Sequence, residues 1–88
     1  MRREFVTILS ESGMHARPAA AISAAARKYR SEIWIQKKGC DKWIDAKEMF
    51  QVLMMKLVYG DEIDIRAEGP DEAEAIMCLA ELFQSRQN

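Results

Sequence analysis

Residues 62–68, with the sequence Glu-Ile-Asp-Ile-Arg-Ala-Glu, alternate between charged and apolar side chains throughout. Successive side chains of a β-strand point to opposite faces of the sheet, so this alternation predicts a strand with one covered face and one face in water. We expect Ile63, Ile65 and Ala67 to face the core and the charged side chains to face outward. Sheets with one face in water are typically antiparallel.

The rest of the chain divides into further strand and helix segments. Clusters of β-branched and aromatic residues predict strands, and an Ala-rich run predicts a helix. Lys38-Gly39 indicates a hairpin turn, and Asp45 and Glu48 have the spacing of a capping box at a helix start. The expected strands are 3–9, 32–37, 40–44 and 62–68; the expected helices are 16–28, 46–57 and a last one that opens at 69–72 and has an apolar stripe of Ala73, Ile76, Met77, Ala80 and Phe83.

The predicted order of elements is therefore β-α-β-β-α-β-α. Three helices can cover only one side of so small a sheet, which favours an α+β fold, a two-layer sandwich with an antiparallel sheet. The chain has 88 residues, of which 49% are hydrophobic. A chain of this size buries roughly 60% of its unfolded surface, and we expect residues 1–88 to form a single domain around one core.

Composition excludes several classes of function. The net charge is −1, with 13 basic and 14 acidic side chains, whereas nucleic-acid-binding domains usually have a strongly basic face. No apolar run approaches the roughly 20 residues of a membrane span, so we expect no membrane insertion. His15 is the only histidine, and Cys40 and Cys78 are far apart, so we expect no metal site and no cofactor. Without a signal peptide, we expect a cytoplasmic protein with reduced thiols.

One segment, residues 12–20, differs from ordinary packing. His15 stands where a turn meets the start of the Ala-rich helix, and Arg17 follows in the first helical turn. The free N–H groups and the dipole of a helix N-terminus attract anions, and a guanidinium adds a full charge. Because imidazole is also a nucleophile, the pattern indicates a phosphoryl group bound near His15 or attached to it. The alternative is that His15 is a helix cap or an ordinary surface residue.

The segment Gly13-Met14-His15-Ala16-Arg17-Pro18-Ala19 resembles the active-site signature G-[LIM]-H-[AT]-R-P-A of HPr, the histidine-containing phosphocarrier of the bacterial sugar phosphotransferase system. Length and element order also agree with that family over nearly the whole chain. The resemblance implies an open-faced sandwich with sheet order 1-4-2-3 and three helices on one face. It also implies a phosphoryl carrier and not an enzyme.

The resemblance further implies roles for named residues. His15 accepts a phosphoryl group at Nδ1 from phosphorylated enzyme I and donates it to a sugar-specific enzyme IIA-type acceptor. Arg17 neutralises the phosphoryl oxygens, the backbone N–H groups of Ala16 and Arg17 hold them, and Ser12 lies close enough in sequence to assist. The carrier is expected to act as a monomer and to leave His15 exposed, because an enclosed phosphate would resist transfer.

The expected helix 46–57 has more apolar residues than one core-facing stripe requires. In HPr proteins the exposed part of this helix docks on enzyme I and on the acceptors. We therefore expect Met49, Phe50, Met54 and the basic Lys47 to form a partner interface, since flexible methionines suit surfaces with several partners. Arg17, Arg27 and Lys47 are expected to steer acidic partners towards it.

Two positions depart from the family pattern. Glu48 stands where many HPr proteins have a kinase-regulated serine, so we expect no control by that modification. Glu48 is either a capping-box residue or a fixed mimic of phosphoserine. Lys56 stands where the family commonly has glycine. The alternative functions are a nitrogen-related relay, a binding-only regulator of other proteins, and an RNA-binding module, which only Trp34 and Trp43 favour and the acidic strand 62–68 disfavours.

Overall fold

The computed structural model describes residues 1–10 and 16–84. The strands and helices over these residues follow the predicted order. They are β1 (Arg2–Thr7), α1 (Ala16–Ala26), β2 (Glu32–Lys37), β3 (Ile44–Asp45), α2 (Met49–Met54), β4 (Glu62–Glu68) and α3 (Glu72–Gln84).

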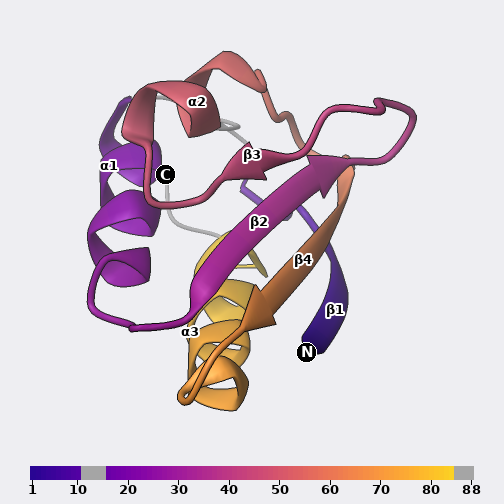
Figure 1. Ribbon diagram of the computed structural model, residues 1–88. Coiled ribbons are helices and arrows are strands. Elements are labelled where there is room, and N and C mark those ends of the chain that lie inside the picture. Colours follow the sequence, from indigo (N-terminus) through magenta and orange to yellow (C-terminus); the bar gives the residue numbers. More distant parts are fainter. Residues whose placement is uncertain (11–15, 85–88) are drawn as a thin grey trace.

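The strands form one antiparallel sheet in the order β1-β4-β2-β3. The helices cover one face of this sheet and the other face is open towards the viewer in Figure 1. The α+β open-faced sandwich with strand order 1-4-2-3 is therefore confirmed. Because β4 pairs with both β1 and β2, the alternating strand 62–68 lies inside the sheet.

The core lies between the sheet and the helices. The two central strands contribute Ile33, Ile35, Ile63 and Ile65, each 1% exposed or less. Burial of one such side chain contributes about 1.5–3 kcal/mol. A slip of one residue in either strand would move its isoleucines to the open face, so this burial fixes the register. The helices supply the facing side chains, among which Ile22, Val52, Leu79 and Phe83 are buried.

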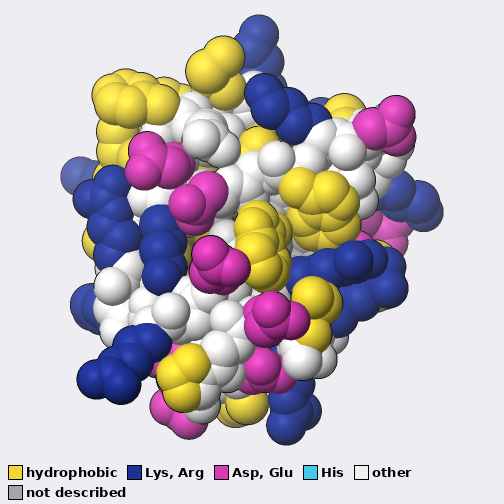
Figure 2. Space-filling view, in the orientation of Figure 1, with side chains coloured by type: hydrophobic (Ala, Val, Ile, Leu, Met, Phe, Trp, Pro, Cys, Tyr) yellow, Lys and Arg dark blue, Asp and Glu magenta, His cyan; other side chains and the backbone are white. Residues whose placement is uncertain are grey.

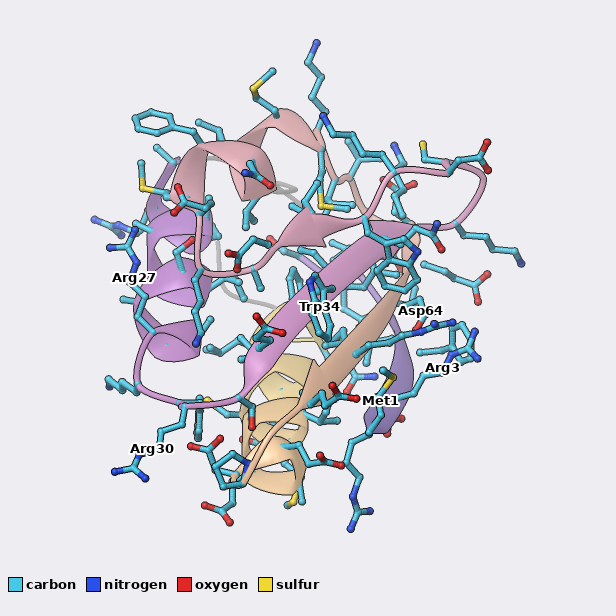
Figure 3. All side chains as sticks on the ribbon, in the orientation of Figure 1. Met1, Arg3, Arg27, Arg30, Trp34 and Asp64 are labelled. Atoms are coloured by element: carbon cyan, nitrogen blue, oxygen red, sulfur yellow. The ribbon has the colours of Figure 1, made fainter. Side chains whose placement is uncertain are left out.

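On the open face, the prediction that every charged side chain of strand 62–68 faces water is wrong for Asp64, which is 7% exposed. Arg3 donates from Nε and Nη2 to the two carboxylate oxygens of Asp64 at 3.2 and 3.0 Å (Figure 3). Arg66 donates from Nη2 to Oδ2 of the same carboxylate at 3.4 Å. Each guanidinium lies over an aromatic ring, Arg3 over Phe5 and Arg66 over Trp43, with its carbon 4.6 Å from the ring centroid. The two arginines cover Asp64 and offset the cost of burying its charge.

The predicted return strand 40–44 is too long, because β3 contains only Ile44 and Asp45. The chain turns at Gly39, where φ is +93°, and Cys40 donates its N–H to the Lys37 carbonyl at 3.0 Å. Residues 40–43 then pass beside the sheet without joining it.

The predicted capping box is also wrong, and helix 46–57 is shorter than expected. The Asp45 carboxylate accepts the N–H of Lys47 at 2.9 Å, which closes a turn before the helix begins. Glu48 is the N-cap of α2, but its side chain makes no capping bond. The side chain that reaches back to the N–H of Asp45 is Gln51, at 3.2 Å. Because Asp45 closes a turn instead of capping a helix, α2 starts only at Met49.

The other two helices differ less from prediction. Helix α1 ends two residues early, where Lys28 and Tyr29 donate to carbonyls three residues back, as in a tightened last turn. In α3 the predicted stripe includes Met77, which is 67% exposed, whereas Ala75 and Leu79 are fully buried. The face of α3 that packs against the sheet therefore includes Ala75 and Ile76, and Met77 lies outside it.

Asp71 joins the start of α3 to the start of β2. Its carboxylate accepts the Ser31 hydroxyl at 2.5 Å and the N–H groups of Arg30 and Ser31 at 2.9 Å each. The Ser31 hydroxyl and the two N–H groups lower the pKa of Asp71 to about 2. The junction is tight, because a Cβ on Gly69 would lie 2.6 Å from the Ser31 Cα.

Lys56 has a φ of +55°, the only positive value among the described non-glycine residues. It follows α2 and donates its N–H to the Leu53 carbonyl at 3.2 Å, as the residue after a helix often does in the left-handed conformation. A side chain with a Cβ is strained there, whereas glycine is not.

We predict that Lys56→Gly raises the free energy of unfolding by about 0.5–1 kcal/mol, because glycine adopts the left-handed conformation without strain. Urea denaturation measures the change. Lys56→Ala is the matched control, because it removes the same charge but keeps the Cβ. If alanine stabilises as much as glycine, the strain account is wrong and the lysine charge is responsible.

We also predict that Asp71→Asn destabilises the fold at neutral pH and that this difference disappears in acid. The folded pKa lies below the ordinary value, so the carboxylate contributes stability above about pH 4 and loses it as the pH falls towards 2. Denaturant unfolding of both proteins at several pH values tests this. A difference that stays constant from pH 7 to pH 2 would contradict the ionic role of Asp71.

Candidate functional site

The described part of the predicted anion site is the N-terminus of α1. Ala16 is its first residue and Arg17 the second, and both are exposed. Pro18 lies in the first turn, where the proline costs no hydrogen bond because those N–H groups have no partner within the helix. The predicted site residues Ser12 and His15 lie outside the described residues.

The charge around this helix start favours an anion. The first turn of α1 contains no acidic residue. Among the described residues, no carboxylate lies within 4.0 Å of the Arg17 guanidinium. The positive end of the helix dipole and the Arg17 charge are therefore not neutralised by described side chains.

Helix α2 packs against α1 and has two different faces. Val52 is fully buried, whereas Phe50 and Met54 are 70% and 77% exposed. Met49 is partly buried and packs against the core. Figure 2 shows hydrophobic side chains gathered at the upper left, over α2. Phe50 and Met54 thus lie on an exposed apolar surface, which the partly buried Met49 joins only in part.

Two basic residues join the end of α1 to the segment before α2. Arg27 donates from Nε to the Lys47 carbonyl at 2.9 Å, and Lys47 donates from Nζ to the Tyr29 carbonyl at 2.9 Å. Both donate to backbone oxygens, and no described carboxylate lies within 4.0 Å of either cation. The described side chains therefore leave both charges unneutralised. Figure 3 shows Arg27 beside α1.

Glu48 is exposed and begins α2 without a side-chain capping bond. The capping-box interpretation of this residue is therefore wrong. No described cation pairs with its carboxylate, which lies at the start of the helix that carries the exposed Phe50 and Met54.

Sequence reasoning did not find the pocket between α2 and the loop of residues 38–43, which Lys37 and Lys42 line. Its lining comes from separate segments of the chain, so no local pattern could indicate it. In residues 1–10 and 16–84, no group of three or more His, Cys, Asp or Glu side chains is arranged to hold a metal ion. None of the helices in that part of the chain has the length and apolarity to cross a membrane.

Comparison with known proteins decides the family. The family described as "PTS HPr component phosphorylation site" matches residues 3–85. The chain belongs to the HPr family.

Relatives and solved structures of the HPr family agree with this assignment. The phosphocarrier protein HPr of Treponema pallidum is 36% identical over 81 residues, covering 92% of this chain and 90% of its own. The crystal structure of HPr-C-His from Thermoanaerobacter tengcongensis has a TM-score of 0.86 at 35% identity, covering 94% of this chain and 91% of its own. The HPr of Bacillus anthracis str. Ames has a TM-score of 0.87 at 31% identity, covering 94% and 96%.

This protein is therefore an HPr-type phosphocarrier of the phosphotransferase system, a carrier and not a catalytic enzyme. The family match covers the segment that contains His15 and Arg17. The exposed start of α1 and the exposed face of α2 belong to the same matched chain.

Proposed function

We propose that His15 accepts a phosphoryl group from phosphorylated enzyme I and donates it to enzyme IIA-type acceptors. The observation that carries the proposal is the start of α1, where Arg17 is exposed and no acidic residue occupies the first turn. In the sequence, His15 comes two residues before Arg17. A helix N-terminus with a free guanidinium stabilises a phosphate dianion on a neighbouring side chain.

The transfer needs no acid–base group on the carrier besides His15 itself. Nδ1 of His15 forms a bond to phosphorus as the bond between phosphorus and the donor atom of enzyme I breaks. The reverse exchange then moves the phosphoryl group to a histidine or cysteine of the acceptor. Arg17, the N–H groups of Ala16 and Arg17, and Ser12 balance the charge on the phosphoryl oxygens, while the partners supply acid–base groups and any metal.

Exposure of the site suits this reversible exchange. Ala16 and Arg17 are both exposed, so a partner can reach the two described residues that are proposed to hold the phosphoryl group. The helix start, Arg17 and the exposed surface of α2 all come from one chain. This favours action as a monomer, because no second copy is needed to complete these parts. We propose the cytoplasm as its location, because both enzyme I and the acceptors would meet it there.

The partner interface is proposed to consist of Met49, Phe50, Met54 and Lys47. Phe50 and Met54 supply exposed apolar area, and Lys47 with Arg17 and Arg27 gives the rim a positive charge. Such a rim speeds encounter with acidic partners more than it tightens the complex.

A binding-only regulator is the second candidate function, because Glu48 is exposed, makes no capping bond and pairs with no described cation at the position of the family's regulatory serine. A regulator of this kind would bind its partner equally well as wild type and as His15→Ala. Loss of that binding in Glu48→Gln, with phosphoryl transfer retained, would support it.

The proposed function predicts an acid-labile phosphate on the chain after incubation with phosphoenolpyruvate and the cognate enzyme I. An N–P bond hydrolyses in acid, unlike a phosphoserine ester, so acid treatment identifies the linkage. His15→Ala should take up no label while keeping the same circular dichroism spectrum. Stable label on the wild type, or equal label on His15→Ala, would rule out the proposal.

We further predict that Arg17→Ala slows phosphoryl uptake by about 10-fold to 100-fold, because it removes the donor that meets charge on the phosphoryl oxygens. Arg30→Ala is the matched control, since Arg30 is also exposed but follows the far end of α1 (Figure 3). Rapid-quench kinetics measure both rates. Equal slowing in the two variants would mean that only the net charge of the carrier matters.

A further inference from the structure

The loop between β2 and β3 and the end of α2 enclose a pocket of about 240 Å³. It lies beside the exposed surface of α2 and is distinct from the start of α1. The residues used below are the apolar Ile44, Met54 and Met55 and the loop residues Lys37, Cys40 and Lys42.

The size and walls of the pocket suit one large apolar side chain. Pockets for small-molecule ligands usually have volumes of about 300–1,000 Å³, so this one is small for a free ligand. Ile44 is buried in β3, whereas Met54 and Met55 are unbranched and adjust to different shapes. A protein anchor residue is therefore the better occupant.

The charges beside the pocket favour a carboxylate next to that anchor. Lys37 pairs with Asp61, Nζ to Oδ2, at 3.4 Å. Lys42 is exposed, and no described carboxylate lies within 4.0 Å of its Nζ. One cation beside the pocket is thus free to pair with an acidic residue of a partner.

The pocket is continuous with the proposed partner interface. Phe50 and Met54 are four residues apart on α2, so they lie on the same side of the helix. Met54 also lines the pocket. A protein that covers Phe50 and Met54 therefore reaches the pocket without a second contact surface.

We infer that this pocket receives an apolar anchor side chain, flanked by a carboxylate, from the phosphoryl donor. The inference rests on the proposed function, because the donor is the partner without which the carrier has nothing to transfer. A single anchor in a pocket commonly contributes a large share of the binding energy of an interface. The loop of residues 38–43 then determines which donor the carrier accepts.

The test places a plug at the pocket and measures transfer from the cognate enzyme I. Cys40 is an exposed free thiol, and N-ethylmaleimide alkylates it in a Cys78→Ala chain. The matched control carries Lys38→Cys, Cys40→Ala and Cys78→Ala, since Lys38 belongs to the same loop but lines a groove on the open sheet face with Arg3 and Phe5. The adduct at Cys40 should raise the KM for the carrier by about fivefold or more, with kcat unchanged, and the adduct at position 38 should not.

The outcomes separate the two proposals. If the unmodified chain is phosphorylated and both adducts leave the same KM, the pocket inference is overturned and the proposed function stands. If the unmodified chain takes no phosphate from enzyme I, the proposed function fails and the inference fails with it. Lys42→Gln should also raise KM whereas Lys38→Gln should not; equal values would overturn the pairing of Lys42 with a donor carboxylate.

Discussion

The burial of one face of the sheet against the helices determines the rest of the structure. Ile33 and Ile35 of β2 and Ile63 and Ile65 of β4 fill the interior, and each is 1% exposed or less. These four side chains fix the register of the central strands, and they require all helices to lie on their side. The opposite face stays open, and on it Arg3 and Arg66 neutralise the charge of the buried Asp64 carboxylate.

The same packing places the functional surface. Helix α1 is held by its buried side, including Ile22 and Ala26, and its first residues Ala16 and Arg17 stay exposed. Helix α2 is held by Val52, which leaves Phe50 and Met54 exposed beside it. A packed base with an exposed helix start suits a phosphocarrier, because an enclosed phosphoryl group would resist transfer.

Much of the fold could be predicted from the sequence because its signals are local. The alternation in residues 62–68 placed Ile63 and Ile65 in the core, and the element order with the HPr resemblance led to the observed strand order. The errors arose where a distant residue intervenes or where near neighbours compete for the same hydrogen-bonding group. Asp64 is buried because Arg3, 61 residues away, covers it. The spacing of Asp45 and Glu48 fits a capping box, but the Lys47 N–H takes the Asp45 carboxylate and Gln51 takes its N–H.

The candidate site divides in the same way. The HPr motif is contiguous, so it indicated His15 and Arg17, and the structure shows the exposed, acid-free helix start that an anion requires. The pocket beside α2 combines side chains from the loop 38–43 with Ile44 and Met54, so no stretch of sequence could indicate it. Helical periodicity also does not show which apolar residues stay exposed, so it wrongly placed Met77 in the buried stripe of α3.

We propose that the N-terminus of α1 holds the phosphoryl group on His15. Two-dimensional ¹H–¹⁵N spectra before and after phosphorylation by enzyme I test it directly. We predict that the amide signals of Ala16 and Arg17 shift most, while those of Ile33 and Ile65 in the sheet stay in place. A phosphorylated chain in which the Ala16 and Arg17 amides do not move would contradict it.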